Sequence, residues 1–183
     1  ARVAAAAEPT AAGSGQYNNS ASLLLDGVLP ADETAFDDAQ CVHWTDPAAS
    51  FVVDLGQMRR LEGVTLQVDN NDDYILETST DGSRFSPYLR VRDTSGQVEW
   101  GMQTVSTLAQ HPAYLPELAV APVVARYVRL RASGGDDAYG LSEIQVASRP
   151  LDAQEATALD EAVSAAADGD GGQAAGRLAA AAG

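Results

Sequence analysis

The chain has 183 residues, which is enough for one ordinary domain with a full hydrophobic core but not comfortably for two. Its 26 acidic residues outnumber 11 basic ones, all arginine, and give a formal net charge of −15. Such a surface repels phosphate backbones and anionic lipids, so we expect no nucleic acid partner and no binding to a membrane surface. The sequence contains no apolar run of about 18 residues, so we also expect no direct membrane span.

The single cysteine, Cys41, excludes an intrachain disulfide and a multi-cysteine metal site. We expect it to fill a small buried apolar position, with an intermolecular disulfide or a reactive thiol as the alternatives. His43 lies two residues away, but no Asn or Asp follows in a known orienting arrangement, so a thiol nucleophile with a histidine base is not predicted. A phosphate-cradling glycine loop and a histidine-rich metal motif are also missing from the sequence. We therefore predict that the protein is not an enzyme.

The two ends of the chain have a low-complexity composition. Residues 1–19 are predicted to be a linker, and residues 149–183 an Ala/Gly-rich tail with a short helix, flanking a folded domain over residues 20–148. The first residue is Ala, which suggests a mature chain whose signal peptide has been removed. Ordering such tails costs backbone entropy that their few apolar groups do not offset, so we expect them to pack against other polypeptides.

The first half of the domain has the pattern of short strands. The apolar run Phe51–Leu55 and the alternating segment Val64–Val68 predict two strands, the second ending at the polar stretch Asp69–Asp73. A third strand is predicted over Tyr74–Ser79, followed by the turn signal Asp81–Gly82.

The second half of the domain continues the same pattern. Arg126–Arg131 sets Tyr127, Val128 and Leu130 among three arginines, with an imperfect alternation. A last strand, Leu141–Val146, follows the turn-rich stretch before it. Many short strands separated by Gly, Asp and Asn turns are typical of an antiparallel β-sandwich.

One helix is predicted after Pro150. Asp152 is placed to cap its N-terminus, and Glu155 suits its first turn. Its apolar residues recur at a spacing of three and four: Ala156, Leu159 and Val163. This narrow, Ala-rich stripe is marginal alone, so we expect the helix to dock on a neighbour.

The order and spacing of these elements resemble the discoidin family, also called coagulation-factor C-type or galactose-binding-like domains. The resemblance implies an all-β fold, an antiparallel eight-stranded jelly-roll-like β-sandwich whose loops at one rim form the binding surface. The chain lacks the terminal cysteine pair of the vertebrate members and the basic apolar spike of the membrane-binding members. The matching motifs are short, and only their order is specific: Leu25-Asp26-Gly27, Trp44, Phe51 to Gly56, Tyr74 to Gly82 with Phe85, Ala125 to Leu130, and Gly140 to Val146.

The same resemblance implies a structural Ca²⁺ site at Asp26 and Glu143, because the corresponding positions of similar bacterial sugar-binding modules meet around a calcium ion. Calcium prefers hard oxygen ligands, including the backbone carbonyls that residues 24–29 would supply. The alternative is that Asp26 only makes a turn and Glu143 is a solvated strand residue. Further ligands stay open among three residues: Asp32, Glu33 and Thr34.

A polar loop and exposed aromatic residues are the candidates for ligand contact. Asn70, Asn71 and Asp73 carry the amide and carboxylate groups that hydrogen-bond sugar hydroxyls, although such residues also suit an ordinary turn. Trp100 and Tyr139 are expected to offer flat apolar faces for a pyranose ring, whereas Trp44 is expected in the core.

Two functions fit these features. The first is a non-catalytic extracytoplasmic binding module, secreted, periplasmic or on the cell surface, that is carbohydrate-binding or adhesive. The second is a structural subunit of a multi-protein extracytoplasmic or membrane-associated complex, held through the sandwich and its tails. The expected partner is therefore a glycan or a protein, within a larger assembly.

Overall fold

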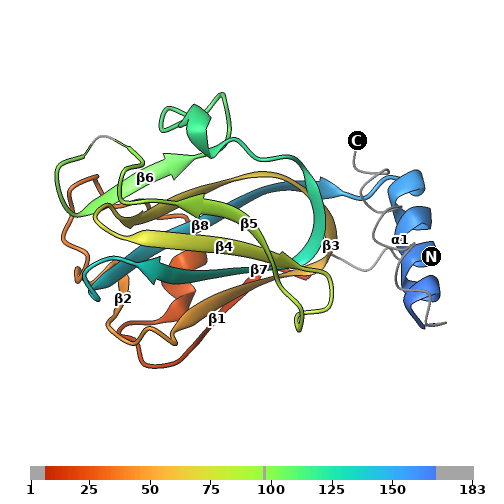
Figure 1. Ribbon diagram of the computed structural model, residues 1–183, viewed down its shortest axis with the longest axis horizontal. Coiled ribbons are helices and arrows are strands. Elements are labelled where there is room, and N and C mark those ends of the chain that lie inside the picture. The colour runs from red at the N-terminus through yellow and green to blue at the C-terminus, as the bar shows by residue number, and fades with distance from the viewer. Residues whose placement is uncertain (1–6, 97, 168–183) are drawn as a thin grey trace.

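The computed structural model describes residues 7–96 and 98–167 and confirms an antiparallel β-sandwich with a short C-terminal helix (Figure 1). The described residues contain no helix that combines the length and the apolar composition needed to cross a bilayer. The elements are, in chain order, β1 (Thr10–Ser14), η1 (Ala21–Leu25), β2 (Val42–Trp44), β3 (Ser50–Asp69), β4 (Asp73–Ser79), β5 (Ser86–Val91), β6 (Met102–Ser106), η2 (Pro116–Leu118), β7 (Val123–Gly134), β8 (Tyr139–Pro150) and α1 (Ala153–Ala167).

The long strand β3 belongs to both layers of the sandwich. Its first half pairs with β1 and β7, and this layer continues through β4 to the edge strand β5. Its second half pairs with β6 and β8, and β8 pairs with β2. The register shifts between Asp54 and Arg59, where Gly56 adopts a positive φ of 77°. Both predicted strand segments, Phe51–Leu55 and Val64–Val68, are confirmed as strand, but they belong to one continuous strand with a bulge instead of to two separate strands.

The sandwich begins inside the segment that the sequence predicted to be a linker. Residues Thr10–Ser14 form β1 and pair with Ser50–Asp54 of β3. A glycine is required at position 13 of this strand, since a Cβ added there would lie 2.5 Å from the Tyr17 ring. That ring in turn packs edge-on against Phe51 at 5.1 Å between centroids.

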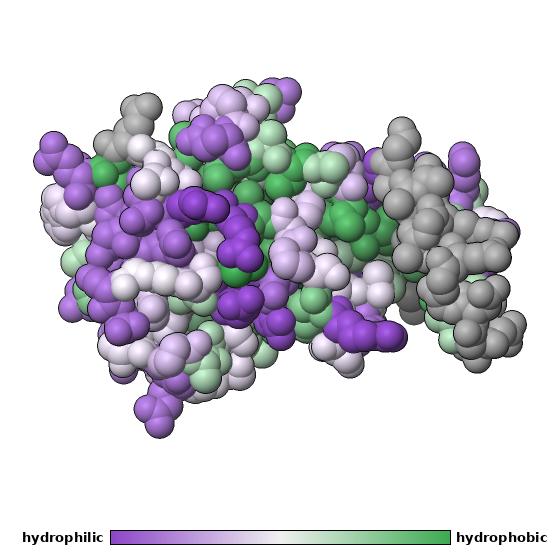
Figure 2. Space-filling view, in the orientation of Figure 1, coloured by the Kyte–Doolittle hydropathy of each residue, from purple (hydrophilic) through white to green (hydrophobic). Residues whose placement is uncertain are grey.

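The core between the layers contains an aromatic cluster. Trp44 lies 4.8 Å from Phe51, 5.6 Å from Tyr139 and 6.3 Å from Tyr74 between ring centroids. Trp44 and Cys41 are both fully buried, which confirms the sequence-based expectation for these two residues. Hydrophilic side chains dominate the outer surface over β4 and β5 (Figure 2).

Helix α1 stands at one end of the sandwich and is fixed there by a carboxylate clamp. Its N-terminus forms a capping box, in which Asp152 Oδ1 accepts from the Glu155 amide at 2.9 Å and Glu155 Oε2 accepts from the Asp152 amide at 2.9 Å. The same Glu155 carboxylate accepts two bonds from Arg149, both 2.8 Å, and one from Arg60 at 3.0 Å. These bonds join the helix to β8 and β3.

The apolar stripe of α1 differs from the predicted one. Val163 is 60% exposed, whereas Ala162 is only 4% exposed. The buried side of the helix therefore runs through Glu155 and Ala162, because the ion pair of Glu155 sets which side turns inward. The expected contact between the tails and other chains concerns largely residues 1–6 and 168–183, which lie outside the described residues.

Replacing Glu155 by Gln tests the clamp. Hydrogen bonds from Arg149 lower the pKa of Glu155 to about 2, so its stabilising effect is present above the ordinary value of 4.5 and is lost as the pH falls toward 2. We expect hydrogen exchange of the α1 amides to accelerate in Glu155→Gln at neutral pH and in the wild type only at acidic pH. The exposed Asp160→Asn on the same helix is the matched control. Equal protection of α1 in both variants at neutral pH would contradict the clamp.

Candidate functional site

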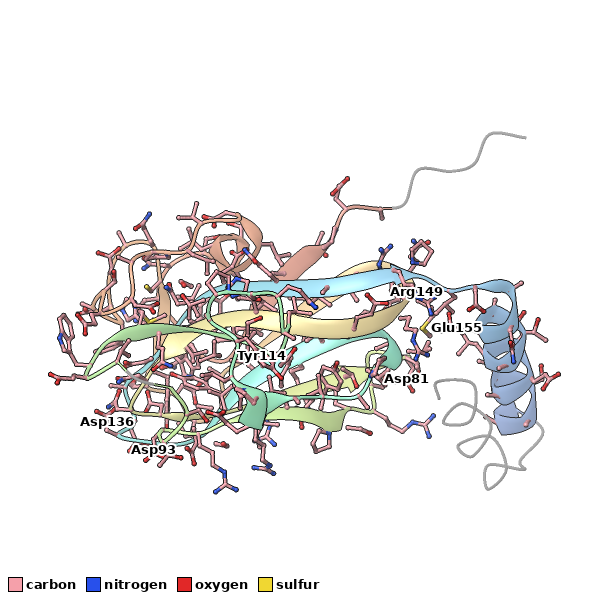
Figure 3. The ribbon with its side chains drawn as sticks, turned by 90° about the horizontal axis from the view of Figure 1, so that it is seen from above. Asp81, Asp93, Tyr114, Asp136, Arg149 and Glu155 are labelled. Atoms are coloured by element: carbon pink, nitrogen blue, oxygen red, sulfur yellow. The ribbon has the colours of Figure 1, made fainter. Side chains whose placement is uncertain are left out.

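Three loops meet at the end of the sandwich opposite α1 and form what we call the rim: residues 69–73, 92–96 with 98–101, and 134–138. The Asn71 side-chain amide donates to Asp136 Oδ2 at 3.0 Å, and the Asp93 backbone amide donates to Asp73 Oδ1 at 2.9 Å. Asp93 and Asp136 lie at the end away from Arg149 and Glu155 (Figure 3).

The rim brings together four of the five residues predicted to contact a ligand: Asn70, Asn71, Asp73 and Trp100. Asn70 holds the loop that carries Trp100, because its backbone amide donates to Gly101 O at 3.0 Å and its side chain donates to Val98 O at 2.7 Å. Trp100 itself is 57% exposed, so much of its indole surface remains open to solvent. Asn71 is also exposed, and its side chain is bonded to Asp136.

Tyr139, the fifth predicted residue, lies in the core. It is 4% exposed, and its ring packs against Trp44 and Tyr74. Only its hydroxyl points toward the rim, where it donates to Asp137 Oδ1 at 3.1 Å. The expectation of a third stacking face does not fit this position, since pairing of Tyr139 with Trp44 at the start of β8 turns the ring inward.

Sequence reasoning missed the buried carboxylate that supports the rim. Asp72 is 1% exposed and accepts from the Asp136 amide at 3.1 Å and from the Tyr74 hydroxyl at 3.2 Å. Gly135 leaves room for it, because a Cβ there would lie 1.7 Å from Asp72 Oδ1. The run of polar residues marks the loop, but a local pattern gives no signal for which aspartate turns inward.

Burial of these acidic groups changes their protonation. It raises the pKa of Asp72 to about 7, and it raises the pKa of Asp69, which is also buried, to about 6. The rim loops are thus held by carboxyl groups that ionise near neutral pH.

The two predicted calcium ligands lie close together on another part of the domain. Asp26 ends η1 and Glu143 lies on β8, where it is 2% exposed. Burial raises the pKa of Glu143 to about 7, with a smaller contribution from the negative charge of Asp26, and the Gly27 amide donates to the Glu143 carboxylate. Glu143 Oε2 is buried without a hydrogen-bond partner. An unpaired carboxylate oxygen beside a second carboxylate fits a bound cation.

Of the further ligands considered from sequence, Asp32 and Thr34 form hydrogen bonds elsewhere, and Glu33 is exposed with its backbone amide bonded to Met102 O. Asp32 Oδ1 accepts from the backbone and side chain of Thr104, both at 2.8 Å, and the Thr34 hydroxyl donates to Ala31 O. Within residues 7–96 and 98–167, no three His, Cys, Asp or Glu side chains are arranged to hold a metal. An ion at Asp26 and Glu143 would need backbone carbonyl groups as additional ligands.

A β-sandwich with a loop rim at one end is the architecture expected of a discoidin-type domain. Residues 5–144 match the family model of the F5/8 type C domain, which covers more than half of the chain. The chain therefore belongs to the F5/8 type C, or discoidin, family. A search of curated proteins finds no match.

Solved structures of similar fold include carbohydrate-related proteins. A fucolectin from striped bass (Morone saxatilis) serum matches with a TM-score of 0.55 and 15% identity over 78% of this chain and 47% of the other. The CBM32 of AlyQ in complex with 4,5-unsaturated mannuronic acid gives 0.52 and 14% identity over 75% and 93%. A family 89 glycoside hydrolase from Clostridium perfringens gives 0.54 and 18% identity over 80% of this chain but 14% of the enzyme. These similarities show the shared fold.

Asp72→Asn tests the buried rim carboxylate. Since the folded state raises the pKa of Asp72 from 3.8 to about 7, its contribution to stability is greatest below pH 3.8 and is lost as the pH rises toward 7. The neutral variant lacks this dependence, so its melting temperature should fall less between these pH values than that of the wild type. Thermal unfolding followed by circular dichroism measures the slopes. The exposed Asp93→Asn is the control, and parallel slopes in all three proteins would refute the assignment.

Proposed function

We propose that this protein is a non-catalytic extracytoplasmic module that binds carbohydrate at its rim. The observation that carries the proposal is the exposed indole of Trp100, fixed through Asn70 beside the polar groups of Asn71 and Asp73. Sugar rings have apolar faces that stack on such a surface and hydroxyls that bond to amides and carboxylates. The F5/8 type C family and the named lectin and CBM32 of similar fold support a glycan as the partner.

The side chains of the rim are arranged for ligand binding and not for catalysis. Asp73 and Asn71 are engaged with the backbone of Asp93 and the side chain of Asp136, which positions them for hydrogen bonding. The buried Asp72 braces the loop behind them, so the polar groups are held before a ligand arrives. Such preorganisation lowers the entropy cost of binding. The proposal therefore assigns no reaction to this site.

A structural role in a larger extracytoplasmic or membrane-associated complex is the second candidate. Its support is the position of α1, which stands at the end of the sandwich away from the rim and exposes 60% of Val163 (Figure 1). A partner that packs on α1 would leave the rim open, so both roles are compatible in one protein.

A structural calcium ion at Asp26 and Glu143 is part of the proposed function. The two carboxylates would hold the ion together with backbone carbonyls of residues 24–29, and the ion would neutralise the buried charge of Glu143. It would fix η1 against β8 and supply no chemistry to the rim.

Glycan binding at the rim is tested with the full chain on an array of neutral galactose-type sugars. We expect weak binding, which Trp100→Ala abolishes, because the stacking face is lost while the fold remains. Val163→Ala removes a similarly exposed apolar side chain on α1 and should leave glycan binding unchanged. An array that stays blank with folded protein argues against the carbohydrate-binding role.

Calcium is tested by thermal unfolding. An ion that binds only the folded state at about 100 times its Kd adds about 2.7 kcal/mol, so saturating Ca²⁺ should raise the melting temperature by several degrees. Asp26→Ala should abolish this gain, whereas the exposed Asp37→Ala should retain it. A calcium-induced shift that persists in Asp26→Ala, or its absence in the wild type, would refute the site.

A further inference from the structure

The outer face of the layer β7–β4–β5 carries a row of arginines in an otherwise acidic protein. Tyr74 and Leu76 of β4 point into the core, so the alternating residues Ile75 and Glu77 point outward. Deep purple, strongly hydrophilic side chains lie over β4 and β5 on this face (Figure 2). Asp73 marks the end of the face next to the rim.

The strand register places the arginines on both sides of β4. Ile75 pairs with Arg90 of β5 and with Arg131 of β7, and Glu77 pairs with Arg129 of β7. Ile75 is only 3% exposed although it points outward. Its neighbours on both adjoining strands are arginines, so their aliphatic stems are placed to cover it while their guanidinium groups extend to the surface.

Glu77 holds two of these guanidinium groups in place. Its carboxylate, 5% exposed, accepts from Arg129 Nε at 2.8 Å and from Arg131 Nη2 at 3.4 Å. Arg129 also stacks on the ring of Phe85, with 4.1 Å to the centroid. Burial acts to raise the pKa of Glu77, but the two arginines outweigh it and lower the pKa, so the carboxylate stays ionised. Arg90 is exposed and forms no ion pair or hydrogen bond among the described residues.

The residue types on this face indicate which class of partner it can bind. Stable protein interfaces bury aromatic or aliphatic anchors, whereas the exposed large apolar residues of the described chain are Val28, Trp100 and Val163, none of which lies in this row. Duplex DNA carries one charge per ~1.7 Å and would be repelled by the net charge of −15. A hydrophilic glycan chain needs no apolar anchor, and its more widely spaced carboxylates are repelled less than the phosphates of DNA. The forked guanidinium group of arginine can form two parallel hydrogen bonds with one carboxylate.

We propose that Arg90, Arg129 and Arg131, around Ile75 and Glu77, form a second binding surface for the carboxylates of a uronate-bearing glycan chain. This surface is separate from the rim and does not depend on the function proposed there.

The test is a titration of the full chain with an oligogalacturonate, followed by NMR chemical shifts and by calorimetry. We expect shifts of the backbone amides of β4, β5 and β7, and an affinity that falls with added salt. Arg90→Gln and Arg131→Gln should each weaken binding about tenfold or more, the value for loss of a charge-assisted hydrogen bond. Arg84→Gln is the matched control, because Arg84 is also an exposed arginine, 91% exposed, but lies on the loop between β4 and β5.

Two comparisons separate this surface from the rim and from other partners. Trp100→Ala should leave oligogalacturonate binding unchanged, and a neutral galacto-oligosaccharide should not shift the amides of this face. Absence of binding, shifts confined to the rim, or equal weakening by Arg84→Gln would overturn the proposal. Tighter binding of duplex DNA or of an acidic peptide to the same residues would also overturn it.

Discussion

The bend of β3 is the constraint on which the two-layer architecture depends. The carboxylate of Asp54 accepts a hydrogen bond from the Gly56 amide at 2.8 Å within the turn. It also accepts hydrogen bonds from Nε and Nη2 of Arg126, at 2.8 and 2.9 Å. Gly56 supplies the positive φ that other residues rarely adopt. Beyond this bulge β3 no longer pairs with β1. Its residues Arg59–Leu61 pair with both β7 and β8, and the strand then continues between β6 and β8. The aromatic core is enclosed between the two halves.

This arrangement separates three surfaces of the domain. The rim is built from loops that meet at one end of the sandwich, the arginine row lies on the outer side of one layer, and α1 is clamped at the other end. Each is supported by a buried acidic residue, namely Asp72, Glu77 and Glu155 respectively. In the last two cases arginines compensate the buried charge, whereas Asp72 is supported by a backbone amide and a tyrosine hydroxyl. The rim is for this reason the most sensitive of the three to pH.

The sequence allowed the fold class, the C-terminal helix and its Asp152 cap to be predicted, because hydrophobic alternation and capping are local signals. Strand β1 was not predicted, since Ala and Gly have low strand propensity and its Gly13 is required by a tertiary contact with the Tyr17 ring. Tyr139 and Asp72 show the same limit at the site. Both lie in polar, turn-rich sequence, yet cross-strand pairing buries the first and contact with Gly135 buries the second. Local pattern therefore located the rim loops but not the direction of their side chains.

The attachment of α1 has a mechanical consequence. Strand β8 runs from Tyr139 beside the rim to Pro150 next to the helix, and it lies along β3 over most of its length. If a ligand at the rim is anchored and tension is applied through α1, the force acts parallel to these two strands. Their backbone hydrogen bonds are then loaded together in shear, instead of breaking one after another as in unzipping. The Glu155 clamp passes part of that tension directly to Arg60 on β3, so α1 resists being pulled from the sandwich through two strands instead of one.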